Sequence, residues 1–185
     1  MPRKRKPQVG DLCLMGRTPR SQKLWWQVLD VVDNKVLVIT DNALPIMQPY
    51  SSATPENSQN FIYKWSTCDI NKWLNSEFIS QYKLEEIPML NIDHVTEGST
   101  FVPEETTNEK VFLLSKTEVE KYFPYKPDRR TLKNSRSYCS WYLRSPGLAE
   151  ACRTSYVDIK GAIYTPGCHV ECNHNIRPAF WLDYS

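Results

Sequence analysis

The sequence predicts an α+β fold. β-rich runs lie near both ends of the 185-residue chain, and two segments with helical periodicity lie between them. Strands and helices do not alternate along the chain, as they would in a parallel α/β sheet. We therefore expect a small twisted antiparallel sheet, two helices packed on it, and long irregular loops.

The first predicted element is a β-hairpin in the stretch LWWQVLDVVDNKVLVIT. Residues 24–32 and 35–40 are rich in β-branched and aromatic side chains, which favour strands. Asp33 and Asn34 stand between the two runs, and such a pair is typical of a tight hairpin turn. An antiparallel sheet is thus expected to begin near the N-terminus. The next segment, residues 41–60, is rich in Pro, Ser and Asn and indicates a loop.

The first predicted helix lies in FIYKWSTCDINKWLNSEFISQY. Apolar residues recur there at helical spacing, which predicts one amphipathic helix. They are Ile70, Trp73, Leu74, Phe78 and Tyr82. Ser66 or Thr67 is placed to cap the helix, and Asp69 falls in its first turn.

A short buried strand, KVFLLS, and a second helix, SKTEVEKYF, follow another long loop. Ser115 and Glu118 have the spacing of a capping box, in which each side chain accepts a backbone N–H of the other residue. Pro124 ends the helix because proline cannot continue it. Further on, YCSWYLRSPG and IRPAFWLDY read as strands, with Trp141, Leu143, Phe180 and Leu182 facing the core.

Composition indicates one globular domain over residues 9–185, preceded by a flexible basic tail over residues 1–8. Hydrophobic residues make up 41% and charged residues 24%, which is ordinary for a folded domain. No apolar run approaches the ~18 residues of a membrane helix, and no signal peptide is visible, so we expect no membrane insertion. The net charge of +2 gives no field for nucleic acid. The block at Arg3 to Lys6 is read as solvated tail, with a localisation or nucleic-acid signal as the alternative.

Between Leu148 and Asn175 lies an irregular mixture of Cys, His, Tyr, Asp and Arg. Cys168, His169, Cys172 and His174 crowd together, but zinc sites usually take paired ligands from two separate elements. Unpaired surface residues, or a disulfide of Cys168 with Cys172 or Cys152, are the favoured alternatives. The other cysteines are expected to be free thiols. No nucleophile elbow, phosphate-binding loop or paired carboxylates stand out, so we expect no enzyme, no metal and no cofactor.

The segments WYLRSPG at Trp141 and IRPAFWL at Ile176 resemble the C-terminal end of a bacterial and viral domain with the C-type lectin fold, related to the formylglycine-generating-enzyme type of fold. WWQVLD at Trp25, WSTCDINKWLNSEF at Trp65 and KVFLLSKTEVEKYF at Lys110 occur in the same order in that family. The resemblance spans about Val9 to Leu182. This family includes the variable proteins of diversity-generating retroelements, in which a reverse transcriptase miscopies adenines and diversifies a C-terminal binding surface.

The resemblance implies a ligand-binding protein with a variable region over residues 148–175. Its partner would be a protein or cell-surface ligand, and a virion surface or cell surface would be its location. The expected framework residues are Trp141, Arg144, Pro146, Val157, Gly161, Gly167, Val170, Arg177 and Pro178. The expected ligand-binding residues are Leu148, Ala149, Cys152, Arg153, Ser155, Tyr156, Asp158, Tyr164, Thr165, Cys168, His169, Cys172 and His174, with Tyr156, Tyr164, Arg153, Asp158 and His169 foremost.

The genetic code bears on this hypothesis. Changing both adenines of an Asn codon cannot yield Trp, Met, Gln, Lys or Glu, and residues 148–175 contain no Trp, Met or Gln, whereas the whole chain has six Trp. Glu150, Lys160 and Glu171 depart from the pattern and must be fixed positions or come from other adenine-bearing codons. The alternatives are an undiversified adhesion or structural module and an oxidase of the formylglycine-generating kind, with copper held by Cys168 and Cys172. A calcium-dependent sugar site is not expected, because the stretch lacks clustered acidic ligands.

Overall fold

The computed structural model describes residues 5–52, 62–133 and 136–185. The chain folds mainly into β-structure, with 42% strand and 15% helix. Within the described ranges there are four sheets and three α-helices. The predicted α+β fold of C-type lectin type, with one small sheet and two helices, is therefore wrong. Its error lies in segments predicted to be loops, because many of them pair as strands.

Two five-stranded sheets form the body of the protein. The first sheet has the order β1-β2-β3-β14-β7. Its strands are β1 Leu12–Arg17, β2 Lys23–Val32, β3 Lys35–Thr40, β14 Ala179–Asp183 and β7 Val111–Phe112. The second sheet has the order β12-β11-β10-β13-β4. Its strands are β12 Ile163–His169, β11 Arg153–Val157, β10 Trp141–Pro146, β13 Asn173–Asn175 and β4 Met47–Pro49.

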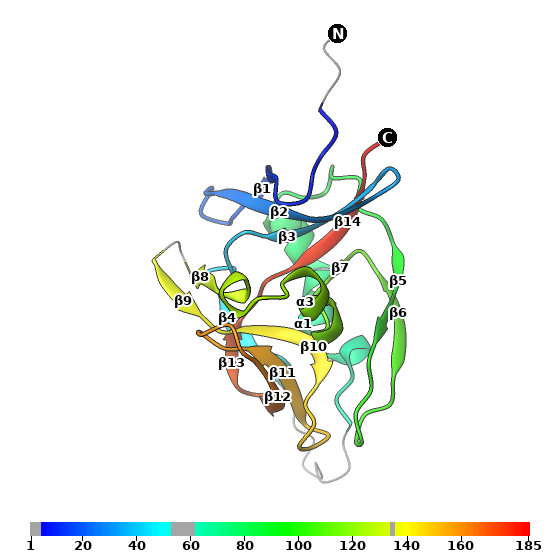
Figure 1. Cartoon of the computed structure of the whole chain (residues 1–185), viewed down its shortest axis with the longest axis vertical. Coiled ribbons are helices and arrows are strands. Elements are labelled where there is room, and N and C mark those ends of the chain that lie inside the picture. The colour runs from blue at the N-terminus through cyan, green and yellow to red at the C-terminus, as the bar shows by residue number, and fades with distance from the viewer. Residues whose placement is uncertain (1–4, 53–61, 134–135) are drawn as a thin grey trace.

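Two hairpins and several short helices complete the fold. The hairpins pair β5 Ile92–Thr96 with β6 Glu105–Glu109, and β8 Thr131–Lys133 with β9 Ser137–Cys139. The α-helices are α1 Asp69–Leu74, α2 Glu77–Gln81 and α3 Lys116–Tyr122. Two 3-10 helices, η2 Trp65–Thr67 and η3 Lys126–Arg129, lie among the described residues. In Figure 1 the first sheet lies at the top and the second at the bottom, with α1 and α3 between them and the β5–β6 hairpin along one side.

The hairpin predicted for residues 24–40 is confirmed. β2 and β3 pair antiparallel, with Val32 opposite Lys35 across the turn. Asp33 adopts a positive φ of 55°, which Asp tolerates better than most residues. β3 is buried from Val36 to Thr40, and it lies between β2 and β14, so both of its edges are paired.

The single helix predicted over residues 69–82 is instead two helices, α1 and α2. The break follows Asn75, whose side-chain amide bonds to strand β7: Nδ2 donates to the Val111 carbonyl at 2.8 Å, and Oδ1 accepts the Val111 N–H at 3.0 Å. Neither Ser66 nor Thr67 caps α1, because both lie in η2; the Cys68 sulfur accepts the Asn71 N–H instead. A contact distant in sequence thus divides the helix.

The predicted capping box of α3 is confirmed. The Ser115 hydroxyl accepts the Glu118 N–H at 3.2 Å, and the Glu118 carboxylate accepts the Ser115 N–H at 2.8 Å. α3 ends at Tyr122, shortly before Pro124. The predicted buried strand KVFLLS is present as β7, which continues into the buried residues Leu113 and Leu114.

The segment expected to be one long irregular loop over residues 148–174 is largely sheet. β11 and β12 pair antiparallel, and β13 joins the second sheet beside β10. The loop predicted over residues 41–60 also contributes a strand, β4, which pairs with β13; residues 53–61 of that loop lie outside the described residues. Both expectations were wrong because half-exposed strands with many polar residues and prolines resemble loops in sequence.

One cluster of buried apolar side chains includes residues of both large sheets, among them Trp26, Val38 and Phe180 from the first and Trp141 and Val157 from the second. Within the predicted tail, residues 1–4 lie outside the described residues. Its described part contacts the C-terminal end, where the Tyr184 hydroxyl donates to the Arg5 carbonyl at 2.7 Å. No helix in the described ranges is long and apolar enough to cross a membrane.

Candidate ligand-binding surface

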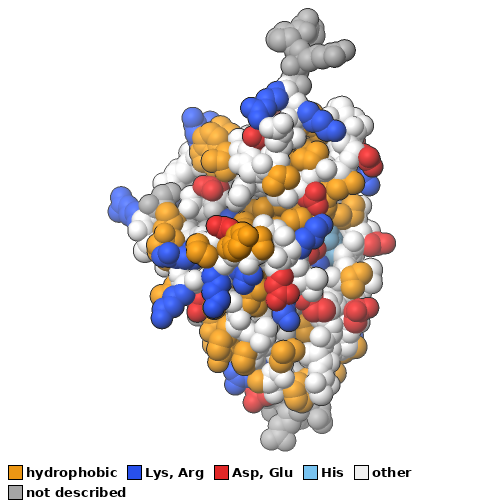
Figure 2. Space-filling model, in the orientation of Figure 1, with side chains coloured by type: hydrophobic (Ala, Val, Ile, Leu, Met, Phe, Trp, Pro, Cys, Tyr) orange, Lys and Arg blue, Asp and Glu red, His pale blue; other side chains and the backbone are white. Residues whose placement is uncertain are grey.

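Residues 148–175 form one exposed side of the second sheet. β11 and β12 make a hairpin at the edge of this sheet, and β13 lies on the other side of β10. The side chains predicted to bind a ligand are therefore fixed on strands and in short turns between them. Figure 2 shows apolar and aromatic side chains gathered on the lower part of the molecule, over β11 and β12.

Four rings on this sheet form a stack that we call the aromatic row: Tyr142, His174, Tyr156 and Tyr164. Tyr142 lies opposite Tyr156 in the register, and Tyr156 lies opposite Tyr164, so the three point to the same face. The His174 ring stacks on Tyr156 with centroids 4.3 Å apart, and Tyr156 lies 5.2 Å from Tyr164. Tyr142 meets the edge of His174 at 5.0 Å. The row runs from the fully buried Tyr142 to Tyr164, which is 46% exposed.

The inner end of the aromatic row is anchored to the fold. The Tyr142 hydroxyl donates to the Cys172 carbonyl, and the Tyr142 ring packs against Tyr50, with centroids 5.4 Å apart. Ser140 Oγ lies 2.5 Å from His174 Nδ1. Burial lowers the pKa of His174 and raises that of Tyr156, so both rings are uncharged at neutral pH. The outer Tyr side chains are thus presented on a rigid, neutral support.

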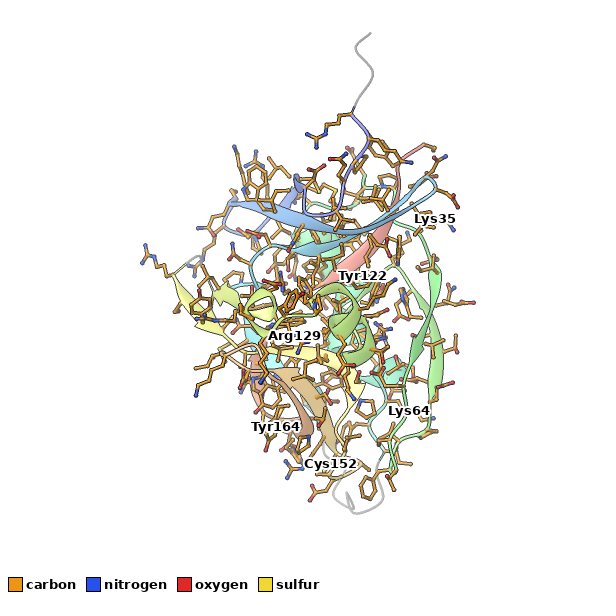
Figure 3. All side chains as sticks on the ribbon, in the orientation of Figure 1. Lys35, Lys64, Tyr122, Arg129, Cys152 and Tyr164 are labelled. Carbon is orange, nitrogen blue, oxygen red and sulfur yellow. The ribbon has the colours of Figure 1, made fainter. Side chains whose placement is uncertain are left out.

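A second group of exposed side chains lies at the end of the sheet near the β10–β11 connection, and we call it the charged end: Glu150, Arg153, His169 and Glu171. Arg153 Nε lies 3.1 Å from Glu150 Oε2, and this ion pair lowers the pKa of Glu150. His169 Nδ1 lies 3.6 Å from Glu171 Oε2. Arg153 also donates to the Gly167 carbonyl at 3.1 Å. Figure 3 shows Tyr164 and Cys152 in the lower part of the molecule, with Cys152 nearer its lower end.

Two residues predicted to contact a ligand make hydrogen bonds to the backbone of the protein instead. Ser155 is 1% exposed, and its hydroxyl donates to the Pro146 carbonyl at 2.8 Å. The Asp158 carboxylate accepts the backbone N–H groups of Lys160 and Ala162, both at 2.8 Å, and so closes the β11–β12 turn. Ser155 is therefore not accessible to a ligand in this conformation, whereas Asp158 is half-buried and uses Oδ1 to hold the turn.

The other predicted contact residues are at least partly accessible. Leu148 is 51% exposed in the β10–β11 connection. Ala149 and Cys172 are also exposed, and three further residues are half-buried: Cys152, Thr165 and Cys168. Exposed and buried positions therefore alternate closely along the segment.

The four Cys and His residues that suggested zinc do not come together as ligands. His174 lies against Ser140 and Tyr156, whereas His169 pairs with Glu171. Burial raises the pKa of the Cys168 thiol to about 12. Within the described ranges no three His, Cys, Asp or Glu side chains are grouped to hold a metal ion. All six cysteines are free thiols.

A comparison with family profiles places most of this structure in one family. The profile described as "Domain of unknown function (DUF6273)" matches residues 33–184, which is more than half of the chain. The chain belongs to the DUF6273 family. No curated protein and no solved structure matches it. The match begins at the β2–β3 turn and contains the whole of residues 148–175.

The residues of this DUF6273 domain that were expected to be framework lie inside the fold. Trp141 is fully buried, and Gly167, Pro178, Pro146, Val157 and Val170 are also buried. Arg144 is 2% exposed and makes a bidentate pair with Glu118, with Nη2 3.0 Å from Oε1. It also donates to Thr96 Oγ1 at 2.9 Å and to the Leu113 carbonyl at 2.7 Å. Arg144 therefore joins the second sheet to α3, β7 and the β5–β6 hairpin.

Arg177 and Gly161 hold two further parts of the DUF6273 domain. The Arg177 guanidinium donates to the Thr40 carbonyl at 2.9 Å and lies 5.3 Å from the Trp141 ring centroid. Burial lowers its pKa to about 10, which still leaves it charged at pH 7. Gly161 has a φ of +82°, and a Cβ there would lie 1.9 Å from the Lys126 carbonyl oxygen. Only glycine fits this turn.

Sequence reasoning missed Tyr142, the innermost ring of the aromatic row. Tyr142 lies between the predicted core residues Trp141 and Leu143, and strand alternation alone places it on the opposite face. That alternation was a usable signal. Tyr50 and Ser140 gave none, because their contacts depend on how β4 and β13 pair with the rest of the sheet.

Proposed function

We propose that this DUF6273 protein is a binding protein, not an enzyme, and that it recognises a protein or another cell-surface ligand through residues 148–175. The observation that carries the proposal is the aromatic row, which ends in an exposed Tyr164 supported by Tyr156 and His174. An ordinary surface tyrosine must lose side-chain freedom on binding. Here neighbouring rings already restrict the side chains, so the entropic cost of binding is small.

The charged end supports the same proposal. Arg153 and His169 are only partly buried and lie in adjacent strands, opposite each other in the register. Tyr and Arg are the side chains that most often dominate binding energy at protein interfaces. A surface with aromatic side chains in one part and charges at the end fits a ligand that presents both apolar and polar groups.

We also propose that this surface is diversified by a retroelement. The thirteen predicted contact residues are all types that an Asn codon yields when its adenines are changed. The backbone beneath them is held by buried groups elsewhere, such as Thr154, whose hydroxyl donates to the Leu143 carbonyl at 3.1 Å. Exposed side chains can then change while the sheet stays in place. The DNA beside the gene tests this step.

An array of cell-surface proteins and glycans tests binding. We expect the wild-type protein to be retained by at least one array member, and the variant Tyr156→Ala/Tyr164→Ala to bind it at least about tenfold more weakly. Trp25→Ala is the matched control, because Trp25 is also an exposed aromatic, 43% accessible, on β2 of the first sheet. Equal loss in the control and the test variant, with both folded by circular dichroism, would contradict the proposal.

The runner-up is an undiversified adhesion module with the same surface. It predicts the same array result, but no near-copy of the segment in neighbouring DNA. The oxidase alternative predicts a different result, namely stoichiometric copper in the purified protein that is lost on changing Cys168 and Cys172 to Ser. That result would count against the binding surface.

A further inference from the structure

A pocket of about 410 Å³ lies away from the surface described above. It is formed by the β1–β2 connection, the loop before β4, the end of α2 and Arg136 at the start of β9. Figure 1 shows the β1–β2 connection and the β8–β9 hairpin on the same side of the molecule. The volume is in the range of pockets that hold small organic ligands.

Two arginines give the pocket a positive charge. Arg20 comes from the β1–β2 connection and Arg136 from the β8–β9 turn, and no acidic residue lines the pocket with them. Neither guanidinium makes an ion pair or a side-chain hydrogen bond with another residue in the described ranges. Two uncompensated guanidinium groups at one pocket favour an anion, and carboxylate and phosphate groups match their planar donor geometry.

A buried hydroxyl belongs to the same pocket. Tyr82 lines it, is 1% exposed, and its hydroxyl has no hydrogen-bond partner among the described residues. The ring is fixed by Phe78 and Trp73, with centroids 4.5 Å and 6.3 Å away, so the side chain cannot turn to find a partner. Buried hydroxyls in proteins are nearly always paired. The Tyr82 hydroxyl is not accessible from the pocket, so Tyr82 forms part of the pocket wall and offers no polar contact to a ligand.

The remaining wall is mainly apolar. Pro19, Pro45 and Ile46 line it, together with Thr18, whose Oγ1 accepts the Gln22 N–H at 3.2 Å and keeps its own hydrogen to donate. An inorganic ion would leave these apolar side chains without a contact. The lining therefore fits a molecule with an anionic group at one end and an apolar body.

We propose that this pocket binds a small organic anion, with its carboxylate or phosphate between Arg20 and Arg136 and its body against Pro19, Pro45 and Ile46. This site is independent of residues 148–175. The protein would then bind a small molecule in this pocket in addition to the ligand proposed for residues 148–175.

Isothermal titration with three probes tests the proposal: phenylacetate, phenyl phosphate and the neutral phenylacetamide. We expect at least one anion to bind saturably, and phenylacetamide to bind at least about tenfold more weakly, because it lacks the charge-assisted bonds. The stronger of the two anions identifies the carboxylate or the phosphate as the preferred group. Equal binding of phenylacetamide, or no saturable binding of either anion up to about 10 mM, would overturn the proposal.

Variants of the full chain locate the site. Arg20→Gln/Arg136→Gln is expected to weaken anion binding at least about tenfold, because it removes both charged donors of the pocket. Arg153→Gln removes the same charge from the charged end and should leave anion binding unchanged. Unaltered binding in the double variant, or a loss in Arg153→Gln as large as in it, would place the anion elsewhere.

Discussion

The two five-stranded sheets of this protein differ in how their strands are held. In the first sheet, β3 and β14 pair without interruption over five residues, and apolar side chains such as Val38 and Phe180 are buried on them. Both sheets contain register shifts, at β1–β2 and β2–β3 in the first and at β10–β11 and β11–β12 in the second. β10 and β13 share a single parallel pair, Trp141 with Asn175.

The second sheet is stabilised mainly by groups beneath its exposed side. Arg144, the hydroxyls of Thr154 and Ser155, and the Asn175 amide all bond to backbone atoms or to other elements. These groups are buried, whereas Tyr164 and Leu148 are exposed. In the second sheet, therefore, the buried groups that hold the backbone and the exposed side chains of the proposed binding surface are different residues.

The largest expected effect comes from Arg144→Met. The change removes the bonds to Thr96, Leu113 and Val95 and leaves the Glu118 carboxylate without its partner. Breaking such a buried pair costs about 3–5 kcal/mol of unfolding free energy. Arg153→Met is the control, because its ion pair with Glu150 is exposed to solvent and should contribute little to stability. Urea unfolding at pH 7 measures both, and equal losses would contradict the division between framework and surface.

Gly161→Ala should have the next largest effect. A positive φ costs an alanine about 1–2 kcal/mol, and the close approach to the Lys126 carbonyl adds about 1–3 kcal/mol. Gly10→Ala separates the two terms: its φ is +89°, but an added Cβ would meet nothing within 4 Å. Thermal unfolding should therefore show a larger loss at Gly161 than at Gly10. A loss no larger than that at Gly10 would show that the β11–β12 turn can move away from η3.

Acidification should destabilise the protein through His94. This residue is 4% exposed, its ring centroid lies 3.7 Å from that of Phe112, and burial together with the Arg144 charge lowers its pKa to about 4. The unfolded chain takes up a proton near pH 6.5 and the folded protein does so only near pH 4. Stability is therefore complete above pH 6.5 and falls as the pH drops toward 4.

The expected loss for His94 is about 2 kcal/mol of unfolding free energy between pH 7.5 and pH 5. Urea unfolding at the two pH values measures it, with His94→Gln as the comparison. The variant should lose this part of the pH dependence. A wild-type protein whose stability depends on pH no more than that of the variant would show that His94 is protonated in the folded state.

The smallest expected effect on stability comes from Tyr164→Ala. The ring is 46% exposed, and its cross-strand contact with Tyr156 contributes about 0.2–1 kcal/mol. Trp25→Ala in the first sheet should cost a similarly small amount. The comparison becomes sharper when stability and array binding are measured together, because only Tyr164→Ala is expected to reduce binding. A loss above about 2 kcal/mol would make Tyr164 part of the framework instead.

Local features were predictable from the sequence and long-range pairings were not. The Asp33–Asn34 turn and the Ser115–Glu118 capping box depend on neighbouring residues, and both were predicted. The break after Asn75 depends on Val111, and the pairing of β4 with β13 joins residues more than a hundred positions apart. The sequence alone was enough to predict the two outer rings of the aromatic row, Tyr156 and Tyr164, as contact residues. Their support by Tyr142 and His174 required the register of the second sheet.

Sequencing the DNA next to the gene tests the central claim most directly. If a retroelement diversifies this surface, we expect a near-copy of the segment that encodes Trp141 to Leu182 beside a reverse transcriptase gene. The copy and the gene should differ only at adenines of the copy. Those differences should fall in codons for accessible residues such as Tyr156, Tyr164 and His169, and should spare those for Trp141, Arg144 and Gly161. No such copy, or differences spread evenly over exposed and buried codons, would contradict the claim that a fixed sheet displays a variable binding surface.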